Sequence, residues 1–180
     1  MTARSSMSDI ILQLRLMVND TNSLEFTDDQ LQDVLDQRAF ISSYEGLNTL
    51  ETILPGGTVE YKEFQADRQW FETDTILTDS AFNTITPDTA DYKLAYFTFA
   101  TSQVIPLLIY GWYYDLNAAA ADVWDLKAAK YASEFDFSVD GGSYNKSQRV
   151  TNARNTAKEY RSKSFTASSM TIIERTDVIT

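Results

Sequence analysis

Two stretches near the start of the chain have apolar residues at the spacing of one face of an α-helix. In residues 9–18 these are Ile10, Ile11, Leu14, Met17 and Val18. Residues 28–38 follow a capping box, in which the Thr27 side chain caps the helix and the Gln30 side chain bonds back to the cap. The pattern therefore predicts a pair of helices over 9–18 and 28–38.

After this pair the pattern changes from helical spacing to alternation. A Pro-Gly-Gly sequence at 55–57 is typical of a turn, and residues 58–64 then alternate between polar and apolar side chains with the period of a β-strand. Residues 70–77 are rich in aromatic and β-branched side chains and are the expected partner strand. The sequence therefore predicts one β-hairpin, near residues 56–77, inserted between helices.

The longest predicted helix covers residues 87–113. Thr86, Pro87 and Asp88 have the order of a helix start, with a cap, a proline in the first position and an acid in the first turn. Apolar residues at helical spacing continue from there, and Pro106 is expected to kink the helix. The aromatic cluster at its end is interpreted as core.

Two more helices are predicted in the last third of the chain. Residues 118–135 are rich in alanine, whose small side chain lets two helices approach closely, and Asn117 is the expected cap. After a glycine pair at 141–142, apolar residues at helical spacing predict a last helix over 146–162. The chain beyond it is polar and has too few apolar residues to join a core.

These elements together predict a mainly α fold: a helical bundle with an inserted β-hairpin and an extended C-terminal arm. At 180 residues, the chain is long enough for one domain with a substantial core. We therefore expect residues 1–163 to form a single helical domain and residues 164–180 to form the arm.

The composition excludes most catalytic and metal-binding machinery. The chain has no cysteine and no histidine, so disulfides, thiol nucleophiles, the commonest general base and the commonest metal ligand are all absent. No catalytic residue, metal ligand or cofactor is predicted, and we do not expect an enzyme. No apolar run reaches membrane-spanning length and the start of the chain lacks a signal-peptide pattern. We therefore expect a protein made in the cytoplasm that contacts no membrane.

Two acidic patterns resemble functional sites without completing them. Residues 136–141 have the oxygen and glycine spacing of an EF-hand loop, but position 12 is Ser147 instead of the glutamate that closes such a site. We interpret this segment as a turn between helices. Four carboxylates on the predicted hairpin form the second pattern: Glu60, Glu63, Glu72 and Asp74. Such residues can form a glycosidase pair, but nothing in the sequence sets their separation, so we interpret them as a solvated acidic hairpin.

The charge is divided sharply along the chain. Residues 1–142 hold 8 Lys/Arg against 23 Asp/Glu, a net charge of −15, whereas residues 143–163 hold 6 against 1, a net charge of +5. The whole chain carries −11, which argues against general affinity for the phosphates of DNA. An acidic body with one cationic helix is typical of a protein that fits against copies of itself or a fixed partner.

The cations of the last predicted helix are candidate docking residues for another subunit or a partner protein. They are Arg149, Arg154, Lys158 and Arg161. Binding of nucleic acid is one interpretation, but among these cations Tyr160 is the only aromatic residue on which a base could stack. Docking on an acidic protein surface is favoured, because the rest of this chain supplies such a surface.

The whole chain resembles the head-to-tail connector proteins of long-tailed bacteriophages, which are also called adaptor, head-completion or neck proteins. The resemblance is carried by Leu12–Met17, Phe26–Leu31, Asp91–Tyr114, Ala118–Asp136, Phe135–Tyr144, Ser147-Gln148, Ala153, Ala157, Tyr160-Arg161 and Arg175–Val178. These motifs specify helix packing and a turn, and they specify no chemistry.

The resemblance implies a structural virion protein in the neck of a tailed phage. Its copies would form a ring, commonly a dodecamer, that binds the portal protein, extends the DNA channel and carries the next neck or tail component. DNA would pass through the channel without sequence-specific binding, and no cofactor is implied. In that family the C-terminal segment reaches into the portal. The corresponding residues here are Met170, Ile172, Ile173, Arg175, Asp177 and Val178.

Two alternatives remain open at this point. The predicted hairpin is larger than a minimal helical adaptor needs, which leaves room for another neck component such as a stopper. A soluble acidic binding protein, either a DNA mimic or an inhibitor, also fits the net charge of −11. Such a protein would be compact and would need no tail that orders on binding.

Overall fold

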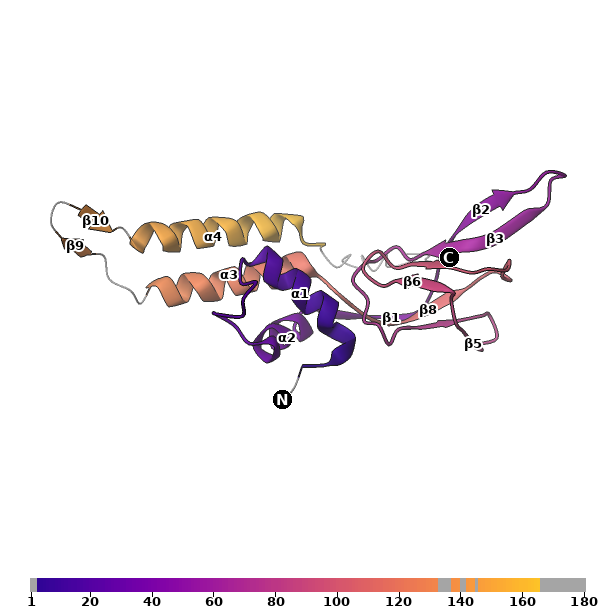
Figure 1. Cartoon of the computed structure of the whole chain (residues 1–180), viewed down its shortest axis with the longest axis horizontal. Helices are drawn as coiled ribbons and strands as arrows, with labels where there is room; N and C mark the ends of the chain where they lie inside the picture. Colours follow the sequence, from indigo (N-terminus) through magenta and orange to yellow (C-terminus); the bar gives the residue numbers. More distant parts are fainter. Residues whose placement is uncertain (1–2, 133–136, 140–141, 145, 166–180) are drawn as a thin grey trace, which may run out of the picture.

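The computed structural model describes residues 3–132, 137–139, 142–144 and 146–165. The molecule is elongated, with helices in one half and β-sheets in the other (Figure 1). The helices are η1 (Ser5–Met7), α1 (Ser8–Met17), α2 (Asp28–Asp36), α3 (Leu116–Ala132) and α4 (Lys146–Lys163). The strands are β1 (Ala39–Gly46), β2 (Asn48–Ile53), β3 (Val59–Gln65), β4 (Ile76–Thr78), β5 (Thr84–Ile85), β6 (Thr89–Asp91), β7 (Tyr96–Thr98), β8 (Leu108–Tyr114), β9 (Phe137–Val139) and β10 (Gly142–Tyr144).

The prediction of a mainly helical bundle with one inserted hairpin is wrong, because the fold combines helices with two four-stranded sheets. Sheet A has the strand order β1-β8-β4-β5, and sheet B has the order β2-β3-β7-β6. The paired strands within each sheet are antiparallel. β9 and β10 form a separate antiparallel hairpin at the far end of α3 and α4 (Figure 1).

A core of aromatic and aliphatic side chains joins the two large sheets. It contains Leu47, Phe64, Ala66, Phe71, Leu77, Ala95, Phe97, Phe99, Leu107, Ile109 and Tyr113. Phe64 of sheet B packs edge-on against Phe99, with ring centroids 5.5 Å apart. This core is built by alternation, since Ile109 and Tyr113 of β8 point inward while Trp112 between them is exposed.

Four of the five predicted helices are confirmed, as α1, α2, α3 and α4. The capping box of α2 forms as expected, with the Thr27 side chain accepting from the Gln30 N–H and the Gln30 side chain accepting from the Thr27 N–H. α3 begins earlier than expected, because Asp115 caps it instead of Asn117: Asp115 Oδ1 accepts the Ala118 N–H at 2.9 Å.

The predicted helix over 87–113 is wrong, since this segment contains β6, β7 and most of β8. Asp88, the acid expected in the first turn of this helix, instead accepts the Ala100 N–H at 2.6 Å, and Asp91 closes a turn. Asp91 Oδ1 accepts the N–H groups of Lys93 and Leu94 at 3.0 and 3.1 Å, and Ala95 follows with a φ of +52°. Such an Asx turn competes with the helix and reverses the chain between β6 and β7.

The predicted hairpin is half right. Its first strand is β3, and the glycines of the preceding turn have the positive φ that the turn requires, +105° at Gly56 and +86° at Gly57. However, β3 pairs with β2 before the turn and with β7, not with residues 70–77. That segment instead leads into β4 of sheet A, next to β8.

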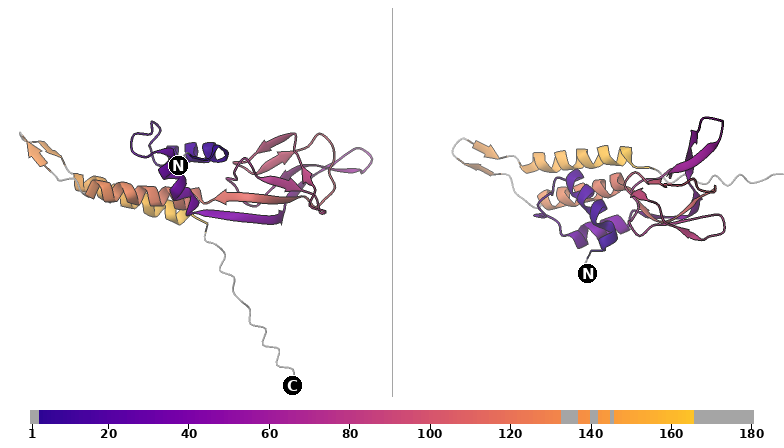
Figure 2. Two further views of the ribbon diagram at one scale, coloured as in Figure 1. Left: turned by 90° about the horizontal axis from the view of Figure 1, so that it is seen from below. Right: turned by 45° about the vertical axis from the view of Figure 1, so that its right-hand side comes forward.

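The helices pack around a second core, made of apolar residues of η1, α1, α2 and α3 with Tyr114 of β8. α4 lies antiparallel along α3 (Figures 1 and 2). Ala153 and Ala157 of α4 are buried at this contact, so small side chains allow the close approach that the sequence predicts. Tyr160 of α4 also donates to the carbonyl oxygen of Met17 at 3.1 Å and so ties α4 to the end of α1.

The loop between α1 and α2 is held by buried charges. Asp20, 4% exposed, accepts the backbone N–H groups of residues 24–26 at 2.9–3.1 Å and Nη1 of the equally buried Arg15 at 2.9 Å. Lys127 of α3, 3% exposed, donates to the Val18 carbonyl oxygen at 2.5 Å and pairs with Glu25 at 2.7 Å. These groups fix the loop against α3.

A glycine in the middle of β8 marks a close approach that can be tested. A Cβ atom at Gly111 would lie 2.9 Å from Cβ and Cγ2 of Thr75 and closer still to its Oγ1. We therefore expect Gly111→Ala to lower the free energy of unfolding by about 1–3 kcal/mol through overpacking. Gly46→Ala in β1 is the matched control, because nothing lies within 4 Å of its added Cβ. Urea unfolding that gives the two variants equal stability would contradict this packing.

Candidate functional site

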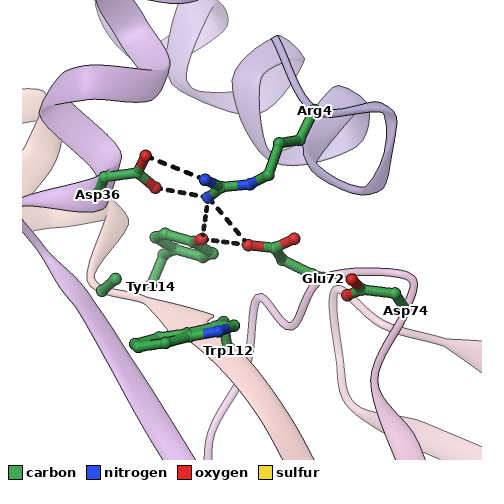
Figure 3. A pocket seen from close by; sticks show the side chains of 7 residues that line it. Arg4, Asp36, Glu72, Asp74, Trp112 and Tyr114 are labelled. Atoms are coloured by element: carbon green, nitrogen blue, oxygen red, sulfur yellow. Dashed lines mark hydrogen bonds and ion pairs between the residues drawn. The ribbon is translucent and has the colours of Figure 1, made fainter.

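An open pocket lies where the helices meet sheet A. Its volume is about 340 Å³, and it is lined by Arg4, Asp36, Ala39, Glu72, Asp74, Trp112 and Tyr114 (Figure 3). These residues come from the segment before η1, the end of α2, the start of β1, the loop before β4, and β8. The pocket thus combines an aromatic wall with three carboxylates and one guanidinium group.

A hydrogen-bond network centred on Glu72 forms the inner wall of the pocket. Glu72 is 2% exposed, and its Oε1 accepts from the Tyr114 hydroxyl and from Arg4 Nη2, the latter at 3.1 Å. Its Oε2 accepts from the Ser6 hydroxyl at 2.5 Å. Arg4 also donates to both carboxylate oxygens of Asp36, at 2.5 and 3.1 Å (Figure 3). One carboxylate therefore ties the N-terminal segment to the end of β8.

The electrostatics of this network favour a structural role over catalysis. Burial raises the pKa of Tyr114 well above its usual range, and the hydrogen bond to Glu72 raises it further. The hydrogen bond to Asp36 raises the pKa of Arg4, with a further contribution from the charge of Glu72. Tyr114 is thus held as a proton donor. Glu72, with both oxygens occupied, is poorly placed to accept a further proton or to attack a substrate.

The outer wall of the same pocket is different, because its carboxylate and its aromatic ring are exposed and the carboxylate makes no ion pair with a described residue. Asp74 is exposed and pairs with no cation among the residues that the structure describes. Trp112 is 47% exposed beside it. An aromatic face next to a carboxylate can receive a lysine or arginine side chain, so this wall is suited to binding a cation from outside.

The four carboxylates that the sequence places on one hairpin are divided between two parts of the fold. Glu60 pairs with Lys62 at 2.7 Å, and Glu63 accepts from the Tyr96 hydroxyl at 2.5 Å, both on sheet B. Glu72 and Asp74 lie in the loop that leads to sheet A. Glu72 and Asp74 both line the pocket, where the hydrogen bonds from Arg4, Ser6 and Tyr114 occupy both oxygens of Glu72.

The predicted docking cations of α4 have different surroundings. Arg149 stacks over the Tyr131 ring, 4.2 Å from its centroid. Arg161 pairs with Asp122 at 3.5 Å and also with Asp125, both on α3, so its charge is used within the chain.

Arg154 and Lys158 differ from these two cations because they point away from the molecule. Both are exposed, and neither makes an ion pair with a residue that the structure describes. At a spacing of four they share one face of α4. These two cations are therefore available to a partner.

Other predicted positions lie outside the described residues. These are the calcium-loop mimic at Asp136, Asp140 and Gly141, and the arm residues Met170, Ile172, Ile173, Arg175, Asp177 and Val178. The described chain ends at Phe165, whose ring lies 5.3 Å from that of Phe40 of β1. Over the described ranges, no group of His, Cys, Asp or Glu is arranged to hold a metal ion. No helix in the same ranges is both long and apolar enough to cross a membrane.

Exposed apolar side chains gather on three parts of the surface. On sheet A and its connecting turn they are Ile41, Tyr44, Ile76, Phe82 and Trp112; on the β2–β3 hairpin, Leu50, Ile53 and Leu54; and on α1, Leu12 and Leu16. The sheet A group includes an ordered ring stack, since Tyr44 stacks on Tyr110 and meets Phe82 edge-on, each with centroids 5.0 Å apart. Large exposed apolar surfaces mark interaction sites in soluble proteins.

Comparison with known proteins gives no identity for the chain. No family model matches it, and no curated protein or solved structure is significantly similar to it.

Reasoning from the sequence missed the pocket and the apolar face of sheet A. The sequence pattern places Trp112 in an apolar core at the end of a helix and indicates no role for Arg4. Residues 108–114 are aliphatic, aromatic or glycine throughout, so the sequence carries no alternation that separates the two faces of this strand. Only the register of β8 places Tyr110 and Trp112 on the face opposite Ile109 and Tyr113. The partnership of Arg4 with Glu72 has no local signal, since 68 residues separate them.

Proposed function

We propose that this protein is a structural component of the neck of a tailed phage. It forms an oligomeric ring that joins the portal protein to the next neck or tail component and extends the DNA channel. The observation that carries the proposal is the distribution of unused binding surface on an elongated body. Exposed apolar residues lie on the sheets, and Arg154 and Lys158 on α4 pair with no residue that the structure describes. The sheets and α4 lie in opposite halves of the molecule (Figure 2). A subunit that contacts a different neighbour at each end needs such an arrangement.

The apolar surfaces support assembly more strongly than they support a compact soluble binding protein. Ile53 at the tip of the β2–β3 hairpin is 70% exposed, and Leu12 and Leu16 on α1 are 53% and 55% exposed. The hairpin also projects from the rest of the molecule (Figure 1). Covering such side chains is worth about 25 cal/mol per Å² of apolar area, so contact with neighbours is favourable.

The net negative charge of the body favours a channel through which DNA passes, and it disfavours a surface that binds DNA. With a net charge of −11, a ring of these subunits presents a wall of the same sign as the phosphates. Affinity from counterion release requires cations and does not build up on such a wall. DNA therefore slides past without sequence-specific contact, and the arm residues from Met170 to Val178 are assigned to the portal.

The test is electron microscopy of the purified protein alone and mixed with the portal rings of the same virus. The expected result is a ring of this protein stacked coaxially on the portal. A truncation after Phe165 should keep the thermal unfolding transition nearly unchanged, because the residues removed are mostly polar and include few apolar side chains that could join a core, and should abolish portal binding. Bare portal rings next to monomeric full-length protein would overturn the proposal.

A further inference from the structure

Sheet A has an outer face that no described element covers. In the antiparallel register Ile41 lies opposite Trp112, and Ile76 lies opposite Tyr110. Opposite residues share one side of a sheet, so these four side chains share one face. Its exposed members are Ile41 (43%), Tyr44 (42%), Ile76 (41%), Phe82 (61%) and Trp112 (47%). These residues with Tyr110 are called the outer face below.

The outer face is ordered before any partner binds. The rings of Tyr44, Tyr110 and Phe82 pack on one another, and the side chains stand on strands that are hydrogen-bonded on both sides at β8 and β4. Rigid aromatic residues lose little conformational entropy on binding and are frequent in the centres of interfaces. The face thus has the composition and the preorganisation of a docking surface.

Acidic groups flank the outer face. Asp74 and Asp79 lie just before and just after β4, which carries Ile76. Asp79 is held ionised, since its hydrogen bonds with Asn83 lower its pKa. At the pocket end, Asp36, Glu72 and Asp74 outnumber the single guanidinium of Arg4. The partner of this face therefore carries positive charge.

The same chain supplies a surface of the complementary charge. Arg154 and Lys158 form an exposed cationic pair on α4, and this helix lies in the opposite half of the elongated molecule (Figure 1). Neither cation makes an ion pair with a described acid of its own chain, so both are available to the outer face of a second copy.

Building on the proposed function, we propose that the outer face of sheet A in one copy docks α4 of a second copy. Arg154 and Lys158 then meet Asp74 and Trp112 at the pocket, where a cation gains both a carboxylate and an aromatic face. The contact joins two different surfaces, so it is head-to-tail, and repeating it produces a closed ring when the rotation between subunits closes.

The absence of cysteine from the chain allows a direct test. Ser43→Cys places a thiol beside Tyr110 on the outer face, and Thr151→Cys places one on the exposed side of α4. With a short bis-maleimide, the double variant should give a ladder of dimers, trimers and larger species. Each single variant should give no crosslinked dimer, because a head-to-tail contact brings two different positions together and each single variant has a thiol at only one of them. Dimers from Ser43→Cys alone or from Thr151→Cys alone would overturn the proposal.

A charge exchange in the same double-cysteine background tests the contact itself. Arg154→Glu with Lys158→Glu should reduce the crosslinked fraction about tenfold or more, and adding Asp74→Lys should restore part of it. Lys62→Glu with Lys93→Glu makes the same change in net charge on sheet B and its turn and should leave the ladder intact. Circular dichroism confirms that each variant is folded. An unchanged ladder after reversal on α4 would contradict the docking.

The outcomes separate this inference from the proposed function. Rings seen on the portal without the ladder would refute the outer-face contact and leave the neck function standing. A ladder without binding to the portal would refute the neck function and leave the contact standing. The absence of both would refute both.

Discussion

Replacing Asp20 with alanine is expected to lower the free energy of unfolding by about 3–5 kcal/mol, because it leaves the buried charge of Arg15 without its buried carboxylate partner. The same change also leaves three backbone N–H groups in residues 24–26 without their acceptor. Arg15 keeps its exposed partner Asp28 at 2.6 Å, but an exposed carboxylate does not compensate for the loss of the buried carboxylate of Asp20. Urea unfolding monitored by circular dichroism measures the effect.

Two variants and the pH dependence complete this test. Asp33→Ala changes an exposed acid of α2 and should stay within about 0.5 kcal/mol of the natural protein.

Burial by itself would raise the pKa of Asp20, but the hydrogen bonds from the N–H groups of residues 24–26 outweigh this effect and the pKa is lowered. The contribution of the Asp20 carboxylate to the free energy of unfolding is therefore present above the unfolded pKa of about 4, and it is lost as the pH falls through the folded pKa. Asp20→Asn should flatten this acid limb, and an equally steep limb would argue against the assignment.

Replacing Glu72 with alanine is expected to have an effect of similar size, about 3–5 kcal/mol. The substitution removes the acceptor for Tyr114, Ser6 and Arg4 at once. Because these three groups come from both halves of the molecule, we expect the helices and the sheets to unfold in separate transitions in the variant. Calorimetry distinguishes one transition from two, and a variant as stable as the natural protein would show that the network contributes nothing.

Tyr114→Phe is the matched variant for this network, since it keeps the buried ring and removes only the hydroxyl. Its expected cost is about 1–3 kcal/mol, because the variant loses the hydrogen bond that the hydroxyl donates to Glu72 and the one that it accepts from Arg4. Burial and Glu72 raise the pKa of Tyr114, so the contribution of the hydroxyl is complete below the unfolded pKa of about 10 and is lost as the pH rises further. The alkaline loss of stability should therefore be smaller in the variant.

The elements that the sequence predicts well are those whose signals are local. The capping box of α2 lies within four residues and specifies the start of the helix, as the structure confirms. The glycines at 56 and 57 likewise specify a turn through their own backbone freedom. In both cases, the residues that carry the signal also form the contacts.

The error over residues 87–113 has a physical cause in ambiguous patterns. Ala90, Leu94 and Phe97 fit a helical stripe, but Ala90 and Phe97 are in fact paired across β6 and β7. The turn between them depends on Asp91 and on an alanine with positive φ. A short apolar run is compatible with either period, and only tertiary contacts decide between them.

The candidate site could not be predicted because its parts are brought together by the fold. Tyr114 and Arg4 are 110 residues apart in sequence, yet their side chains are 2.9 Å apart. The cationic face of α4 is the part that the sequence did predict, since charge and helical spacing are local properties. The surface that would receive it required the strand register of sheet A, which no pattern in the sequence specified.

The junction at Asp115 has a mechanical consequence. β8 passes into α3 through this one buried residue, whose carboxylate also accepts the Ser164 hydroxyl at 2.7 Å and whose N–H donates to the Arg38 carbonyl oxygen at 3.2 Å. A single-residue connection has no slack to absorb rotation, and the extra bonds tie the exit of α4 and the entry of β1 to the same point. We therefore expect β8 and α3 to move as one body, so that a tilt of α3 and α4 also turns sheet A.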